Sequence, residues 1–451
     1  MSRGARGRVG MTATKDEPLR RDIGFFGSAF LSFNGVVGAG IFALPGTLYE
    51  KFGAFSPFLF PLFGLLVLLV ALPFARVAAH HHISGGPVVY AAVFGPAASF
   101  QAGWLYYVAR AAALAANLTV LVTYLAKLWP PLADPVPRGA VILAVVCAIV
   151  AVNAVGVKRA VRLLDALTLL KAAPLLLVAL AGLVVAGASI DPVEGVPAFT
   201  QLEAAALVVL YAFVGFENSV VPAGETADPQ RTIPRALVAT IVSTAALYFL
   251  IQLAFVAVME PGEGKEAPLL AFGTALFGTA GGVALTIVAV CSILGNVSGG
   301  VTGTTRTTYA MGRDGLLPKW FGRVSARYAT PVNSIIFMGA LIALLAMSGS
   351  FLVLAAASTL ARLIVYSICI ASLPKHERPT PLVWTMMAAG VAVCAWAAIR
   401  NTNPNYPPAV LWSVLAGLVV VGTLLYAAAR FSARRGRVSS IQPPPSTLDP
   451  S

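Results

Sequence analysis

Long apolar stretches recur from one end of this sequence to the other, and few charged residues interrupt them. Hydrophobic residues make up 58% of the 451-residue chain and charged residues 11%, whereas roughly a quarter of the residues in a soluble domain are charged. A helix needs about 20 mostly apolar residues to cross a hydrocarbon core about 30 Å thick. The sequence therefore predicts an all-α membrane protein that crosses the bilayer about twelve times.

The predicted spans have ends defined only to within several residues. The polar, basic N-terminus leads into an apolar stretch that contains Gly and Pro, which is not typical of a signal peptide, so we expect no cleaved leader. The spans are placed at 24–44, 54–75, 100–126, 139–156, 164–188, 203–221, 236–258, 280–304, 332–348, 351–372, 381–399 and 408–429.

Basic residues are distributed unevenly between the loops on the two sides of these spans. With the N-terminus on the inner side, only five of the 31 Lys and Arg residues fall in outer loops and three fall within spans, which leaves 23 on the inner side. This asymmetry follows the positive-inside rule, so both termini are predicted to be cytoplasmic. The net charge of +13 then reflects orientation in the membrane, and no nucleic-acid partner is expected. The five outer residues are Lys51, Lys127, Arg138, Lys265 and Arg400.

The four cysteines lie within apolar spans and form no CxxC motif: Cys147, Cys291, Cys369 and Cys394. Such positions are typical of small buried side chains. We therefore expect no disulfide, no metal site and no cofactor.

Two spans contain residues that interrupt a helix. The span at 24–44 reads FFGSAFLSFNGVVGAGIFALPG, and the span at 203–221 is interrupted around Gly215, in YAFVGFENS. Broken backbone is tolerated at membrane depth where it faces protein or a watery cavity. These are the first spans of two five-span halves, and matched interruptions of this kind indicate a transporter substrate site between inverted repeats. The alternative is that the glycines only let helices pack closely.

The two interruptions would expose complementary backbone groups. A helix that begins after Gly38-Ala39-Gly40 presents unpaired N–H groups and the positive end of its dipole, which suit a carboxylate. A helix that ends near Val214 presents unpaired carbonyl groups, which suit an ammonium group. The sequence thus predicts a clamp for a zwitterion that requires no charged side chain.

Several segments spread over almost the whole chain carry a family signature. In order they are GVVGAGIFALPG, SGGPVVY, LLDALTLLKAAPLLLVALAGL, YAFVGFENSVVPAGETADPQRTIPRAL and TTRTTYAMGRDGLLPKWFGRVSARYATPVNS. The chain resembles the amino acid–polyamine–organocation (APC) permeases. This resemblance implies the leucine-transporter-like fold, a 5+5 inverted repeat in which helices 1 and 6 are broken. It also implies substrate binding at the breaks, by Gly38, Ala39, Gly40, Ile41, Tyr211, Phe213 and Val214.

Among these residues, Tyr211 matches a position that often holds an aromatic gate in the family, although an ordinary packing role is equally compatible with the sequence.

Lys171 matches a lysine of sodium-independent relatives. The resemblance implies that its ammonium lies where sodium-coupled members bind the ion, and that it bridges spans 1 and 8 there. We predict a coupling role for Lys171, with proton exchange and a permanently charged strut as the two alternatives.

Four charged residues fall well inside the spans: Arg110, Lys171, Glu217 and Arg362. Each costs roughly 2.5–3.5 kcal/mol at a helix centre on insertion scales, so a functional or paired role is the default expectation. Glu217 follows the second break, where it either braces the bend or titrates during coupling. Structural pairing is expected for both arginines, and Arg110 is a candidate to contact substrate or to neutralise Glu217.

These observations predict a secondary active transporter of amino acids that works by alternating access, without sodium, as a proton-coupled carrier or an exchanger. A polyamine or amino acid/amine antiporter is the alternative, ranked second because Glu217 is the acidic residue well inside a span. No enzyme is expected, since the sequence shows no catalytic constellation at membrane depth. The expected partners are an amino acid substrate, protons and the lipid bilayer, and the oligomeric state is left open.

The predicted organisation has four parts and a bacterial cytoplasmic membrane location. Residues 1–23 form a cytoplasmic basic N-terminus, and residues 24–372 form a ten-helix transport core with repeats at about 24–188 and 203–372. Residues 373–430 supply helices 11 and 12. A disordered cytoplasmic tail, rich in proline, occupies 431–451.

Overall fold

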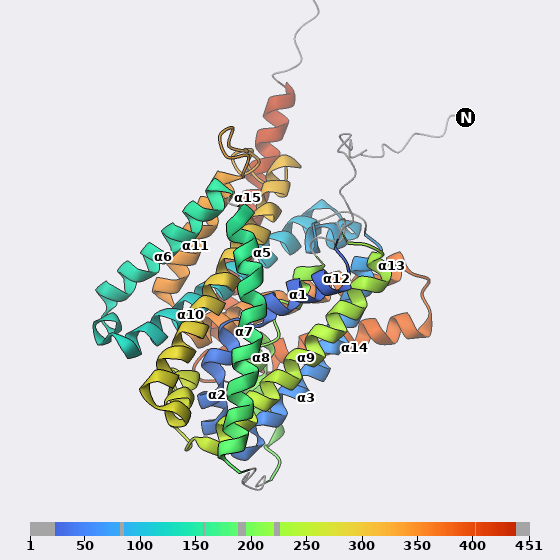
Figure 1. Ribbon diagram of the computed structural model, residues 1–451. Helices are drawn as coiled ribbons and strands as arrows, with labels where there is room; N and C mark the ends of the chain where they lie inside the picture. The colour runs from blue at the N-terminus through green and yellow to red at the C-terminus, as the bar shows by residue number, and fades with distance from the viewer. Residues whose placement is uncertain are drawn as a thin grey trace, which may run out of the picture.

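The computed structural model describes residues 23–81, 85–156, 158–187, 195–220, 226–401 and 403–438, and for 158–170 and 432–438 it describes the backbone alone. Within these ranges the regular elements are all helical, which confirms the all-α class (Figure 1). The elements are α1 Phe25–Val36, α2 Ala39–Phe52, η1 Gly53–Phe58, α3 Leu59–Ala79, α4 Pro87–Tyr90, η2 Ala91–Phe94, α5 Pro96–Leu128, η3 Pro130–Ala133, α6 Pro135–Val155, α7 Lys158–Val185, α8 Phe199–Tyr211, η4 Phe216–Ser219, α9 Pro229–Val258, α10 Pro268–Arg313, α11 Val332–Ser348, α12 Phe351–Ala371, α13 Leu373–His376, α14 Pro381–Ile399 and α15 Pro408–Val438.

Every predicted span overlaps one or two of these helices. In the described part of the chain, nine helices are long and apolar enough to cross a membrane. Shorter apolar helices accompany them at Phe25–Val36, Lys171–Val185 and Val332–Ser348. The chain is therefore a multi-pass membrane protein.

Both predicted interruptions are present. The first span divides into α1 and α2, because Val37 and Gly38 leave the helical region with ψ values of 85° and −143°. In the second, α8 ends at Tyr211, a turn follows, and Gly215 adopts a φ of +117° before η4 begins. Glycine adopts such a φ without steric cost, which explains why the second break falls at this residue.

The helices divide into interior and peripheral members. α5 packs against α10 and α12, and α3 packs against α9. In α5, 72% of the most apolar 18-residue stretch is buried inside the protein. The buried share of the corresponding stretch is only 22% in α6 and 17% in α15. The apolar outer faces of these peripheral helices suit contact with lipid. Figure 1 shows α6 beside α11 at one edge of the bundle.

Ion pairs connect loops that the sequence places on the same side of the membrane. Lys265, between α9 and α10, lies 2.7 Å from Glu50 at the end of α2, and both belong to predicted outer loops. Arg76 and Glu377, from two predicted inner loops, also form an ion pair. These contacts agree with the predicted alternation of sides, while the assignment of one side to the cytoplasm stays a prediction.

Three details differ from the sequence-based expectation. α10 begins before the predicted span 280–304 and kinks at Phe277 and Gly278. α15 continues to Val438, whereas the disordered tail was expected from residue 431. Ala and Arg favour helix here and the proline run begins only at residue 443, which explains the longer helix. Finally, Cys147 is exposed on α6, so not every cysteine is buried.

Three predicted segments lie outside the described residues, in whole or in part. They are the N-terminal segment up to residue 22, the tail from 439, and most of the loop between α7 and α8 at 188–194. The repeat boundaries at about 24–188 and 203–372 stay predictions.

Candidate functional site

The two broken helices meet at their breaks. The Ser32 hydroxyl of α1 donates a hydrogen bond to the carbonyl oxygen of Phe216 in η4 at 2.5 Å. A small cavity lies between the breaks, and α5 and α10 close it from the other sides. Its lining residues are Gly35, Val36, Gly38, Ala39, Gly40, Arg110, Ala113, Asn117, Tyr211, Val214 and Asn296.

The first break contributes the N-terminus of α2. Gly38 precedes the helix, and Ala39 is its first residue. The Ala39 N–H donates to the side-chain oxygen of Asn117 at 3.1 Å. The other N–H groups of the first turn have no partner within the helix, so they are available to an anion. A Cβ on Gly40 would lie 3.1 Å from the Cα of Ala212, which shows how closely the two breaks approach.

The second break contributes the C-terminal end of α8. The N–H groups of Ala212, Phe213 and Val214 each bond to a carbonyl three residues back, at 3.0–3.1 Å. This tightened last turn leaves the carbonyls of these residues beyond the helix, the arrangement that suits a cation or an ammonium group. Val214 lines the cavity. The cavity therefore has N–H donors on one side and carbonyl acceptors on the other.

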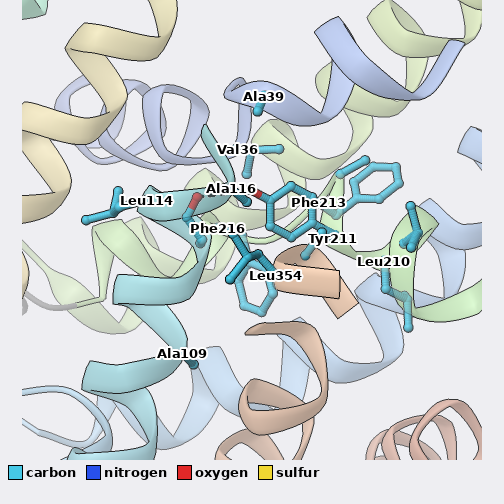
Figure 2. Close-up of a cluster of buried hydrophobic side chains, with 14 of the residues drawn as sticks. Val36, Ala39, Ala109, Leu114, Ala116, Leu210, Tyr211, Phe213, Phe216 and Leu354 are labelled. Carbon is cyan, nitrogen blue, oxygen red and sulfur yellow. Dashed lines mark hydrogen bonds between the residues drawn. The ribbon is translucent and has the colours of Figure 1, made fainter. Parts of the chain in front are cut away.

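Tyr211 stands between these two ends. Its hydroxyl lies 3.1 Å from the Asn117 side-chain oxygen and 3.2 Å from the Ala113 carbonyl, each within hydrogen-bond range. Its ring packs edge-on against Phe351 of α12, with 5.7 Å between ring centroids. Figure 2 shows Tyr211 among the hydrophobic side chains that surround the breaks, including Val36. Both predicted roles, a gate and a packing aromatic, are compatible with this position.

Two asparagines that sequence reasoning missed hold the site together. The Asn117 side-chain amide of α5 donates to the side-chain oxygen of Asn296 in α10 at 2.9 Å. The Asn296 amide donates in turn to the carbonyls of Asn34 and Gly35, at 2.8 and 3.0 Å. An uncharged amide inside an apolar span is the signal that would have found both residues, because such a group needs a buried partner.

Lys171 of α7 lies behind the first break and does not line the cavity. Its ammonium donates to the Val37 carbonyl at 2.7 Å, and to the side-chain and main-chain oxygens of Asn34 at 2.7 and 3.2 Å. The expected bridge from span 1 to span 8 is indirect in this structure. Both Lys171 and Asn296 of α10 donate to the same carbonyl, that of Asn34.

Glu217 of η4 binds back to its own break. One carboxylate oxygen accepts the N–H of Gly215 at 2.9 Å, and the other lies 3.5 Å from the Nε of Arg362 in α12. Both side chains of this ion pair are at most 1% exposed. Among the described residues, Arg362 is thus the charged partner of Glu217. Arg110 lines the cavity, and its buried Nε has no hydrogen-bond partner among the described residues.

The predicted binding residues divide into two groups. Gly38, Ala39, Gly40, Tyr211 and Val214 line the cavity between the breaks. The other two predicted binding residues are buried outside it: Ile41 and Phe213. The predicted coupling residues stand behind the two breaks: Lys171 and Glu217.

A multi-pass helical bundle whose two broken helices enclose a polar cavity has the architecture of a membrane transporter. The chain matches the amino acid permease family over residues 23–424, and it belongs to this family.

Proteins of similar sequence are also named as transporters. The chain is 31% identical to uncharacterized transporters of Mycobacterium bovis and Mycobacterium tuberculosis, in an alignment that covers 93% of this chain and 94% of theirs. It is 30% identical to a putative arginine/ornithine antiporter of Bacillus subtilis, with 76% of this chain and 81% of that protein covered.

Proposed function

We propose that this protein is a secondary active transporter that carries amino acids across a bacterial cytoplasmic membrane by alternating access, without sodium. The observation that carries the proposal is that the N-terminus of α2 and the end of α8 open on one cavity. The substrate carboxylate binds the N–H groups that follow Gly38, and its ammonium group binds the carbonyls around Val214. Family membership supports an amino acid as substrate.

The dimensions of the cavity support alternating access. The cavity is about as large as a single water molecule, so an amino acid enters only after the side chains around it move. Tyr211 is the candidate gate, because its hydroxyl contacts Asn117 of α5 and its ring contacts Phe351 of α12. Release of these contacts would let α8 separate from both helices.

The surroundings of Lys171 support sodium independence. Three oxygen atoms of α1 and the first break surround a charged ammonium, so the positive charge that an ion would supply is already in place. Whether the carrier couples to protons or exchanges substrates depends on whether Lys171 loses its proton during the cycle. Exchange is favoured by one relative, which is named as an antiporter.

Antiport of a cationic amino acid or amine is the second candidate, and the name of the same relative is what favours it. A second ammonium group on the substrate needs an acidic partner. Among the described residues, Glu217 is the acidic side chain that contacts the second break, and its carboxylate already contacts the Gly215 N–H and Arg362. This occupied carboxylate makes the amine antiporter the weaker candidate.

Uptake into proteoliposomes tests the proposal. Radiolabelled amino acids are offered to the purified full chain with sodium replaced by choline, with and without a pH gradient. The best substrate is then challenged with its own amide and methyl ester. Loss of the carboxylate charge leaves N–H groups of α2 poorly paired, at a cost of about 1–3 kcal/mol, so these analogues should compete at least tenfold more weakly. Equal competition by the ester would contradict the clamp.

A further inference from the structure

Two buried arginines lie beside the proposed substrate site with more hydrogen-bonding capacity than the described protein uses. Arg110 of α5 is 3% exposed and lines the cavity between the breaks. Arg362 of α12 is fully buried. An arginine is never deprotonated in a protein and has five N–H donors, so each carries a charge that the interior must balance.

Arg362 is the less satisfied of the two. None of its three side-chain nitrogens has a hydrogen-bond partner among the described residues. Its contact with Glu217 is an ion pair at 3.5 Å, longer than the usual N–H···O hydrogen bond. The Glu217 oxygen that faces it is also without a hydrogen-bond partner among those residues.

A second small cavity extends the site towards Arg362. Its lining includes Leu210, Phe213 and Val214 of the second break, together with Thr359, Arg362 and Tyr366 of α12. Val214 also lines the first cavity, where Arg110 lies. The two cavities therefore adjoin at the point where α8 ends, with one arginine on each.

The described charges around the breaks do not balance. Lys171 is satisfied by three oxygen atoms of α1 and its break. Arg110 and Arg362 remain, and Glu217 is the acidic residue that contacts one of them. Among these two arginines and Glu217, one positive charge is left over. An unpaired buried charge is strongly unfavourable, and a ligand that brings a negative charge would remove the imbalance.

We propose that the transported amino acid carries a second carboxylate, on its side chain, which Arg110 binds directly and Arg362 stabilises from beyond Val214. This inference rests on the proposed function and names its substrate class. The α-carboxylate and ammonium group occupy the two helix ends, and the side chain points towards the arginines. A neutral side chain would leave Arg110 unpaired, and a cationic one would be repelled by both guanidinium groups.

Competition between L-glutamate and L-glutamine tests the proposal, because the two amino acids have nearly the same shape and differ in side-chain charge. In proteoliposomes with the full chain, glutamate should compete for uptake at least tenfold better than glutamine. Arg110→Gln should remove most of this preference, because glutamate should compete at least tenfold more weakly in this variant while glutamine competes as before. Arg400→Gln is the matched control, since Arg400 pairs with Glu203 at a predicted outer loop, and its preference should equal that of the wild type.

The outcomes separate the substrate class from the proposed function. If glutamine, arginine or ornithine competes as well as glutamate, the acidic substrate class is wrong although the protein is still an amino acid transporter. If no amino acid is taken up or competes, the proposed function itself fails. Should Arg110→Gln not reconstitute, Arg110→Lys retains the charge without the planar fork. It should still prefer glutamate, and equal competition by glutamine in that variant would overturn the proposal.

Discussion

A Cβ placed on Gly35 of α1 would lie 2.5 Å from the carbonyl oxygen of Gly215, and one placed on Gly215 would lie 2.3 Å from the carbonyl carbon of Gly35. The two breaks therefore touch through their backbones, and the Asn218 side chain lies against the same contact, 2.2 Å from that Cβ on Gly35. Such contact brings the end of α8 up to the N-terminus of α2. Any movement that opens one break must also move the other, which couples the two halves of the proposed clamp.

Gly35→Ala should abolish uptake. The new methyl group would meet the Gly215 carbonyl, and relief of that clash would push the breaks apart at a cost of about 1–3 kcal/mol. The measurement is initial uptake in proteoliposomes, with reconstituted protein quantified. Gly303→Ala in α10 is the control, because a Cβ there meets no atom within 4 Å. Wild-type uptake by Gly35→Ala would show that the close contact is not required.

Asn117→Ala and Asn296→Ala should each lower the thermal stability of the protein and weaken substrate binding. The effects of the two substitutions should not add. Each removes one side of the same hydrogen bond and leaves the other amide with an unpaired group, at a cost of about 1–3 kcal/mol. A double-mutant cycle of thermal unfolding in detergent and of uptake KM measures the coupling. Asn153→Ala on α6 serves as the control, since its partners are Ile149, Ser298 and Thr302. Strict additivity for Asn117 and Asn296 would contradict the amide link.

Uptake should be unchanged when choline replaces sodium at constant pH. The ammonium of Lys171 already lies among the oxygen atoms of Asn34 and Val37, so no metal ion is needed as their partner. The measurement is initial uptake of the best substrate in each salt, with potassium as a third condition. Loss of most uptake in choline would mean that this interpretation of Lys171 is wrong.

Lys171→Ala should lose accumulation driven by a pH gradient and retain exchange of internal for external substrate. If the proton on Lys171 is the one that couples, its removal separates binding from coupling. Lys171→Arg should be uncoupled in the same way, because a guanidinium stays charged. Accumulation and exchange are measured separately on the same liposomes. Wild-type protein that ignores the gradient would identify Lys171 as a strut and the protein as an exchanger or facilitator.

Tyr211→Phe should raise the KM for uptake by about 2- to 12-fold, the equivalent of about 0.5–1.5 kcal/mol for one hydrogen bond. The substitution removes the contact with Asn117 and keeps the ring against Phe351. Tyr211→Ala removes both contacts and should reduce the maximal rate as well. A Tyr211→Ala variant with wild-type kinetics would show that Tyr211 is an ordinary packing residue.

Sequence reasoning was most successful where a property is local. A run of apolar residues must lie in lipid whatever its neighbours are, so each of the predicted spans coincides with helix. Glycine allows backbone conformations outside the helix, and both predicted interruptions are present, at Val37-Gly38 and at Gly215, whereas Pro45 lies inside α2. The end of α15 was placed too early, because the basic segment after Arg430 reads as a tail although its residues also favour helix.

The sequence did not predict in the same way which side chains contact one another across helices. Arg110 was the candidate to neutralise Glu217 in the sequence, and only the tertiary structure identifies Arg362 of α12 as its charged partner. Asn117 and Asn296 are 179 residues apart, and neither asparagine alone indicates the other. Lys171 was expected to bridge spans 1 and 8 directly. In the structure, Lys171 and Asn296 both donate a hydrogen bond to the carbonyl of Asn34.

The sequence by itself determined that this chain lies in a membrane, which segments cross it, and where two of them break. Those properties follow from transfer free energy and backbone sterics, which act residue by residue. Only the tertiary structure decided that Gly35 meets Gly215, that two asparagines join the breaks, and that Arg110 faces the cavity. These contacts depend on how helices distant in the chain rotate and pack against one another, and apolar periodicity does not specify that rotation in lipid because all faces of a helix are hydrophobic.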